Sequence, residues 1–220
     1  MRQALSYPQE TPTMNKDDLA RYSVIERLRD QRSVAIRAIR PNDKALIIEA
    51  LRGLSDDSIY FRLFASKREF TDTDLKEITE VDFLKVVALV AVLDQNGSDR
   101  IVGEARYIRT GEADTTQKAE VALLVDDAFH GLGVATRLLK HLIAIARQAG
   151  ITHFEAEVLR SNQAMLNILI RSGLPVTMTA TRDFVYAVMD LRVEGQSPAI
   201  GRAKGSSVRR GVADLEGSLK

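Results

Sequence analysis

Cysteine is absent from this chain of 220 residues. The absence excludes a thiolate nucleophile, a disulfide framework and every zinc site that is built on cysteine. Long apolar runs are lacking as well, since the longest, Val86 to Leu93, is far shorter than the roughly 20 residues of a membrane-spanning helix. The N-terminal segment contains no apolar stretch of signal-peptide length. We therefore expect a cytoplasmic protein with no membrane partner.

Neither sign of charge is in excess. The 31 Lys and Arg residues nearly balance the 30 Asp and Glu residues, which leaves a net charge of +1. A chain-wide field that would attract nucleic acid is therefore missing. The three histidines, His130, His141 and His153, do not have metal-ligand spacing. We expect His141 on the solvent-facing side of a helix, beside Arg137 and Lys140, and we expect neither a metal nor a nucleic-acid partner.

The composition nevertheless allows a packed core, because 45% of the residues are hydrophobic, and the length suits one domain. Residues 1–31 are rich in polar and charged residues and predict an N-terminal extension, with one short helix between Leu19 and Leu28. Residues 193–220 are rich in Gly, Ser and charge without periodicity, which predicts a flexible C-terminal tail. The domain itself is expected at residues 32–192.

Hydrophobic periodicity within 32–192 predicts an unusual order of elements. One strand is followed by two helices and three consecutive strands, and helices then alternate with strands. The expected strands are 34–40, 85–93, 100–108, 119–125, 152–159 and 184–191. The expected helices are 44–54, a segment that begins at 55, 133–148 and 162–171. Because a run of strands precedes the alternation, we predict a mixed α/β (α+β) layered domain rather than a doubly wound sheet.

The segment AEVALLVDDAFHGLGVAT, from Ala119 to Thr136, carries the clearest chemical pattern. A strand leads into a glycine-containing turn, and the turn opens a helix. The first N–H groups of a helix have no internal partner, and the helix dipole is positive there. Gly131 and Gly133 remove side chains that would hold a phosphate away from those groups, so the pattern predicts a pyrophosphate cradle. The alternative is a tight strand–helix turn with no ligand. The third glycine of a dinucleotide site and the Gly-Lys-Ser/Thr of a P-loop are both missing.

The same turn, HGLGVA, resembles the Gln/Arg-x-x-Gly-x-Gly/Ala signature of the GNAT superfamily of N-acetyltransferases, with His130 first, Gly133 fourth and Ala135 sixth. An Asn that opens the helix after the next strand, here Asn162, is a second feature of that family. The segments IRAIRPND and LSDDSIYFRLF resemble the N-terminal half of the acetyltransferase domain of bacterial protein-lysine acetyltransferases. The resemblance implies a central, mostly antiparallel mixed sheet flanked by helices, with acetyl-CoA as co-substrate.

Carried over position by position, the resemblance also implies the cofactor contacts. The end of the strand would pair with the pantetheine arm, the turn would hold the pyrophosphate, and the Asn would bond the pantetheine further along. These implied residues are Leu123, Leu124, Val125, Gly131, Leu132, Gly133, Val134, Ala135, Thr136 and Asn162. Two positions depart from the family: His130 replaces the usual Gln or Arg, and Leu169 stands where many relatives have a tyrosine general acid.

An amine must be neutral to attack a thioester. A lysine with a pKa of about 10.4 is roughly 0.1% neutral near pH 7.4, so we expect the protein to supply a general base. Glu120 begins the strand that leads to the cradle, where similar lysine acetyltransferases have a catalytic glutamate. Glu157 on the next strand is the alternative, and Glu104 is a third candidate. Each of the three also has a simpler interpretation, as a solvated strand residue or one half of an ion pair.

The sequence as a whole predicts an N-acetyltransferase that moves an acetyl group from acetyl-CoA to an amine, with a protein lysine favoured. One alternative is an enzyme for small-molecule amines. Another is a non-catalytic domain that binds acyl-CoA, which the replaced residues at 130 and 169 would permit.

Overall fold

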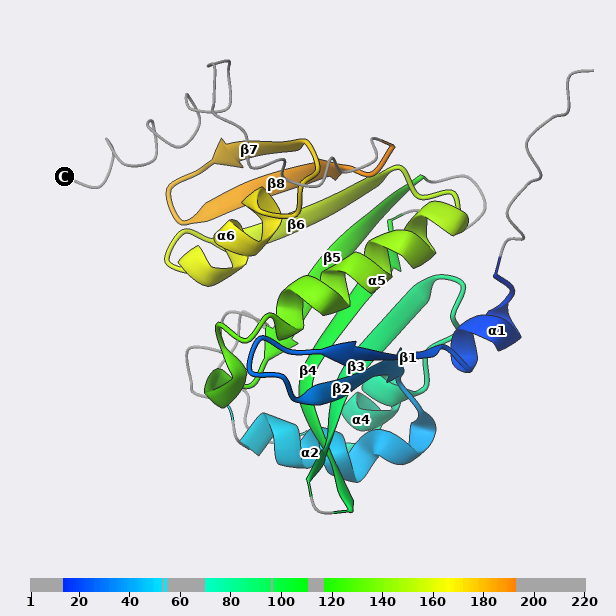
Figure 1. Ribbon diagram of the computed structural model, residues 1–220. Helices are drawn as coiled ribbons and strands as arrows, with labels where there is room; N and C mark the ends of the chain where they lie inside the picture. The colour runs from blue at the N-terminus through cyan, green and yellow to red at the C-terminus, as the bar shows by residue number, and fades with distance from the viewer. Residues whose placement is uncertain (1–13, 53, 55–69, 96, 111–116, 193–220) are drawn as a thin grey trace, which may run out of the picture.

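The computed structural model describes residues 14–52, 54, 70–95, 97–110 and 117–192 (Figure 1). Within these residues, eight strands form one sheet in the order β1-β2-β3-β4-β5-β6-β8-β7. The strands are β1 Ser23–Arg27, β2 Ser33–Ala38, β3 Val86–Gln95, β4 Ser98–Arg109, β5 Lys118–Val125, β6 His153–Leu159, β7 Val176–Ala180 and β8 Phe184–Asp190. All neighbours pair antiparallel except β5 and β6, which are parallel. This mixed, mostly antiparallel sheet confirms the predicted fold class.

Helices cover both faces of the sheet. They are α1 Lys16–Ala20, α2 Lys44–Arg52, α4 Asp72–Thr79, α5 Val134–Gln148 and α6 Gln163–Ile170, with short 3-10 turns at Pro41–Asp43 and Asp127–Phe129. β3 shows the two layers best, because Leu89 and Ala91 pack in the cluster that contains α5, whereas Val90 packs in the cluster that contains α2 and α4. The long apolar run in the sequence is therefore a strand that is buried on both faces.

A buried ion pair holds α2 in place. Both terminal nitrogens of the Arg37 guanidinium donate to the Asp43 carboxylate, at 2.7 and 2.8 Å, and both side chains are under 10% exposed. The backbone N–H of Arg40 donates to the same carboxylate at 2.8 Å. The segment IRAIRPND thus forms a strand end, a buried clamp and a helix start, because the two charges need each other once they leave water.

The parallel pairing of β5 and β6 is short. It covers Lys118 to Glu120 on one strand and His153 to Glu155 on the other, and no paired residues follow within the described chain. β5 continues to Val125 while it pairs with β4 alone. Figure 1 shows β5 and β6 running apart toward the end at which α5 begins. Past Glu120 the edge of β5 that faces β6 therefore has no neighbouring strand.

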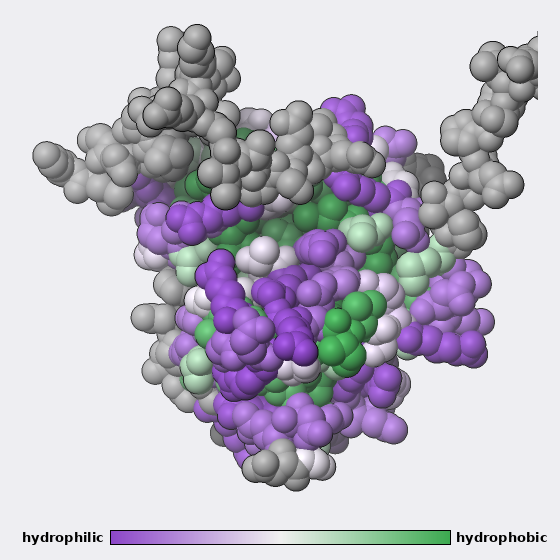
Figure 2. Space-filling view, in the orientation of Figure 1, coloured by the Kyte–Doolittle hydropathy of each residue, from purple (hydrophilic) through white to green (hydrophobic). Residues whose placement is uncertain are grey.

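The N-terminal region differs from the prediction. A helix between Leu19 and Leu28 was expected, but the chain there forms α1 and then β1, an edge strand of the sheet. Asn15 caps α1 by accepting the N–H groups of Asp17 and Asp18, and the helix lasts only five residues. The sheet thus begins inside the segment 1–31. Figure 2 shows a hydrophobic patch over β1, where Val24 and Ile25 are 38% and 67% exposed.

Other elements were predicted with small errors at their ends, or were missed. β7 and α4 were not expected, although Thr71 and Asp74 form a capping box at the start of α4, with N–H···O distances of 2.7 and 3.2 Å. The expected helical segment from residue 55 lies outside the described residues, as do the terminal segments 1–13 and 193–220.

β4 and α5 touch at Gly103, where a side chain would not fit. A Cβ there would lie 2.9 Å from Val134 Cγ1, 3.1 Å from Leu138 Cδ1 and 3.2 Å from the Leu124 carbonyl oxygen. We predict that Gly103→Ala lowers the free energy of unfolding by about 1–3 kcal/mol, because it pushes the first turn of α5 off the sheet. Urea denaturation measures the change.

The matched control is a double-mutant cycle with Val134→Ala, which removes the nearest obstructing atom. The double variant should lose less stability than the sum of the two single losses. Strictly additive losses would mean that the contact between Gly103 and Val134 is not the constraint.

Candidate functional site

The glycine turn leaves helix amides unpaired. Gly131 and Gly133 have φ angles of 75° and 88°, a region that favours glycine, and Gly133 is the N-cap of α5. The first α5 bond at this end runs from Arg137 N to Gly133 O at 3.1 Å. Within the described chain, no protein acceptor is found for the N–H groups of Gly133 and of the next three residues. The positive end of the helix dipole is thus open to a ligand.

A cavity of about 330 Å³ lies against this turn. Nine of the ten residues expected to bind the cofactor line it. They are Leu123, Leu124, Val125, Gly131, Gly133, Val134, Ala135, Thr136 and Asn162. Leu132 is the exception, because it packs against the core, and its carbonyl oxygen accepts the N–H of Arg29 at 3.1 Å. The cavity brings together the free edge of β5, the start of α5 and the start of α6.

Asn162 is held by the helix that it opens. Asn162 is the N-cap of α6, and its side-chain oxygen accepts a hydrogen bond from the N–H of Met165 at 3.0 Å. The side-chain NH₂ donates to no protein acceptor in the described chain. A ligand in the cavity can therefore receive a hydrogen bond from a side chain whose position is already fixed.

His130 has a local role in this turn. Its Nε2 lies 3.0 Å from the carbonyl oxygen of Val125, so Nε2 carries the proton and donates. The ring is half exposed and also lies 3.5 Å from Asp127 Oδ1. The side chain at the first position of the turn thus ties the end of β5 to the loop.

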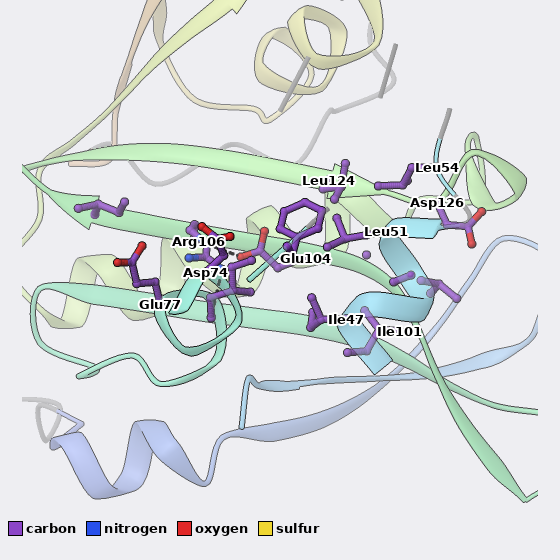
Figure 3. Close-up of a pocket in the computed structure, with 16 residues that line it drawn as sticks. Ile47, Leu51, Leu54, Asp74, Glu77, Ile101, Glu104, Arg106, Leu124 and Asp126 are labelled. Carbon is purple, nitrogen blue, oxygen red and sulfur yellow. Dashed lines mark hydrogen bonds and ion pairs between the residues drawn. The ribbon is translucent and has the colours of Figure 1, made fainter. Parts of the chain in front are cut away.

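A second cavity, of about 440 Å³, opens between α2, α4 and the sheet (Figure 3). Its walls are mainly apolar side chains from α2, β4 and β5. Figure 3 places Asp74, Glu77, Glu104 and Arg106 together at one side, and Leu51 and Leu124 toward the other. Leu124 lines both cavities, so both spaces border the end of β5.

The three candidate bases lie in different surroundings. Glu104 lines the second cavity and is buried, with the Arg106 Nε donating to its carboxylate at 2.5 Å. Glu120 and Glu157 line neither cavity and are exposed. Glu120 occupies the last paired position between β5 and β6, and Glu157 lies two residues beyond the same point on β6. The two exposed carboxylates therefore flank the place where the strands part.

Three polar side chains, Lys118, Glu155 and Tyr186, interact where β5 and β6 are paired. The Lys118 ammonium donates to the Glu155 carboxylate at 2.9 Å, and this hydrogen bond holds the pKa of Glu155 below its ordinary value. Partial burial, followed by the hydrogen bond to Glu155, raises the pKa of Tyr186. Tyr186 therefore stays protonated at neutral pH. Leu169, at the position where relatives have a tyrosine acid, is 1% exposed and belongs to the core.

Two features of the site region were missed. His141 was expected to face solvent, but it is buried between α5 and the N-terminal residues, which corrects that prediction. The Tyr22 hydroxyl lies 2.5 Å from His141 Nδ1, and His141 Nε2 lies 3.0 Å from the Glu26 carboxylate. Arg29, from the turn after β1, lines the first cavity. No local pattern marks these contacts, because they join residues more than 100 positions apart.

Among the residues described, no cluster of side chains has the composition of a metal site. None of the helices in the described part of the chain is long and apolar enough to cross a membrane.

Comparison with known proteins gives consistent matches. The profile of the Acetyltransferase (GNAT) family matches residues 57–173. Acetyltransferase PA5475 of Pseudomonas aeruginosa is 29% identical over 149 residues, which are 68% of this chain and 78% of that protein. Acetyltransferase Pat of Mycolicibacterium smegmatis is 32% identical over 138 residues, which are 63% of this chain and 40% of that protein. The chain thus spans less than half the length of Pat.

Two solved structures have the same fold. The GNAT domain of S. lividans PAT has a TM-score of 0.70 and 32% identity, with 76% of this chain and 96% of that chain covered. An acetyltransferase from Salmonella typhimurium, solved with its cofactor acetyl-CoA, has a TM-score of 0.57 and 22% identity, with 76% and 99% covered. At that identity the second likeness concerns the fold alone.

The Lys118–Glu155 pair gives a prediction for stability against pH. Because the folded pKa of Glu155 lies below its ordinary value of 4.5, the pair stabilises the fold above pH 4.5 and loses this effect as the pH falls through the lowered pKa. Glu155→Gln should therefore lower the urea midpoint at pH 7, and the difference from the unaltered protein should shrink at pH 3. Glu157→Gln, on the same strand face, is the control. An equal, pH-dependent loss in both variants would contradict the assignment to the pair.

Proposed function

The chain belongs to the Acetyltransferase (GNAT) family, whose co-substrate is acetyl-CoA, and from that premise we propose that it acetylates lysine side chains of proteins. The observation that carries the proposal is that two cavities of different chemistry share Leu124 as a lining residue. One cavity has free helix amides for an anionic, phosphate-bearing arm, and the other has apolar walls and carboxylates for a cationic, aliphatic one.

The donor would enter between β5 and β6. Pantetheine amides would pair with the free edge at Leu123 to Val125, since that edge lacks a neighbouring strand. The pyrophosphate would lie at the unpaired amides of Gly133 to Thr136, and the Asn162 NH₂ would donate to the arm between them. Such an arrangement directs the thioester toward Leu124, where the acceptor cavity begins.

The acceptor cavity has the chemistry of a lysine side chain. Four methylenes would pack against apolar side chains such as Ile47, Leu51 and Ile101, while Asp74 and Glu77 attract the ammonium group. Small amines share that charge. What favours a protein lysine is that IRAIRPND leads into α2, and LSDDSIYFRLF begins at Leu54, which lines this cavity. These two segments carry the resemblance to bacterial protein-lysine acetyltransferases.

The reaction would be a direct attack. A general base removes one proton from the lysine ammonium, the neutral nitrogen forms a bond to the acetyl carbonyl carbon, and the C–S bond to CoA breaks. The second proton of the nitrogen then passes to the CoA thiolate or to solvent, which leaves a neutral amide. A main-chain N–H near Leu124 would hold the developing oxyanion. The CoA thiolate leaves without a tyrosine acid, since Leu169 is buried and apolar. A thiolate is a stable enough leaving group near neutral pH, because thiols are far stronger acids than alcohols or amines; the thiol of cysteine has an ordinary pKa of about 8.5.

We assign the base to Glu120, with Glu157 as the alternative. Both carboxylates are exposed and flank the point where β5 and β6 part, so either would accept a proton, directly or through a water molecule, from an amine held at that opening. Glu104 is less suited, because its carboxylate is buried against Arg106. Glu120 is favoured because it lies on β5, the strand that also carries Leu124.

The test of the function is an acetyl transfer assay with three acceptors. Acetyl-CoA is mixed with a peptide that has an internal lysine and a blocked N-terminus, with the same peptide after lysine-to-arginine replacement, or with a polyamine. CoA release and the product mass should show acetylation of the lysine peptide alone. Transfer only to the polyamine would support the small-molecule alternative. Acetyl-CoA binding without any transfer would support a non-catalytic domain.

A second prediction concerns the base. Glu120→Gln should lower kcat at pH 7 by about 100-fold or more, a loss typical of removing a general base. The deficit should narrow toward pH 10, because the amine then loses its proton to solvent. A pH–rate profile between pH 6 and 10 on the lysine peptide measures it.

Glu157→Gln is the matched control for this profile. It removes an exposed carboxylate from the other side of the same opening, and it should keep turnover within a few-fold. If the two variants exchange behaviour, the base is Glu157. Full activity of Glu120→Gln at every pH would contradict the assignment.

A further inference from the structure

The turn between β1 and β2 brings Arg29 against the glycine turn, 102 positions later in the chain. Its Nη1 donates to the carbonyl oxygen of Gly131 at 2.8 Å, and its backbone N–H donates to the carbonyl oxygen of Leu132 at 3.1 Å. A Cβ placed on Gly133 would lie 3.8 Å from Arg29 Nε. The guanidinium group therefore lies over the start of α5, in the wall of the donor cavity.

Arg29 differs from the other arginines around this turn. Arg32 pairs with Asp30 at 2.6 Å, Arg100 with Asp126 at 2.6 Å, and Arg137 lies 3.7 Å from Glu26. Within the described chain Arg29 has no carboxylate partner, and its Nε and Nη2 donate to no protein acceptor. These two donors and the charge are therefore available to an anion.

The lining of the donor cavity has the matching charge. It includes Arg29, His130 and Arg171 and no Asp or Glu. Arg171 lies at the C-terminal end of α6, whereas the amide cradle is at the start of α5. His130 occupies the position of the family's usual Gln or Arg, but its Nε2 already donates to Val125 O. Arg137 also reaches the turn, since its Nη1 donates to the carbonyl oxygen of Gly133 at 3.2 Å, but it lines neither cavity. Arg29 is therefore the arginine that faces the donor cavity beside the cradle.

We propose that Arg29 is a cofactor-binding residue whose guanidinium contacts the diphosphate of acetyl-CoA, and that the N-terminal hairpin thereby completes the donor site. The inference rests on acetyl-CoA being the donor in this cavity. A guanidinium matches phosphate oxygens in geometry and charge, and it acts here beside helix amides that favour the same anion. The hairpin supplies the cation that the loop lacks at His130.

Calorimetric titration of the full chain tests the contact, with CoA and with dephospho-CoA, which lacks the 3′-phosphate. Arg29→Gln should weaken the binding of both ligands about tenfold, the effect of losing a charged hydrogen bond at a partly exposed site. The loss should shrink as salt rises, because the pairing is screened. Arg27→Gln is the control, since it removes the same charge from the same hairpin at a position that lines neither cavity. It should leave both affinities within twofold.

Three other outcomes would overturn the inference, and one further variant would support it. Unchanged affinity in Arg29→Gln would show that Arg29 does not bind the cofactor. A loss with CoA but not with dephospho-CoA would assign the contact to the 3′-phosphate. Arg29→Lys should recover most of the affinity, because it keeps the charge; a loss as large as that of the Gln variant would mean that the bond to Gly131 only shapes the loop. If the unaltered protein bound neither ligand, the proposed function itself would fail instead.

Discussion

The site depends on two adjacent strands that pair for three residues and then part. The hydrogen-bonding edge of β5 past Glu120 has no strand beside it, and the chain that leaves β5 turns into α5 with its first amides also unpaired. Backbone groups away from water need partners, so this opening is a place where a ligand with amides and phosphates completes the protein. The glycines at 131 and 133 serve the same opening, since their left-handed φ angles aim the amides outward.

Local backbone structure is what the sequence predicted well. A strand, two glycines and an amphipathic helix follow one another from Ala119 to Thr136, so the turn could be predicted from consecutive residues, and nine expected residues line one cavity. What that cavity binds was known only through the family. β3 was also predicted, because a strand covered on both faces has an unbroken apolar run. Glu120 was ranked above Glu157 through the family resemblance alone, since the geometry of the choice depends on how two strands diverge.

Long-range contacts were beyond the sequence. β1 is an edge strand that exposes Val24 and Ile25, so it lacks the alternation by which a half-buried strand is identified. The burial of His141 depends on Tyr22 and Glu26, which reach it only after the hairpin has docked on α5. Helical spacing alone placed His141 beside Arg137 and Lys140, so it was predicted to be exposed, whereas it is buried.

The short strand β1 also protects the sheet. Its five paired residues cover the outer edge of β2. The two charged residues of β1, Glu26 and Arg27, discourage the docking of a foreign strand. A chain trimmed to begin at residue 32 would present β2 to solvent as a bare template for intermolecular β-pairing. Aggregation of such a shortened protein would then reflect the lost cover and would say nothing about catalysis.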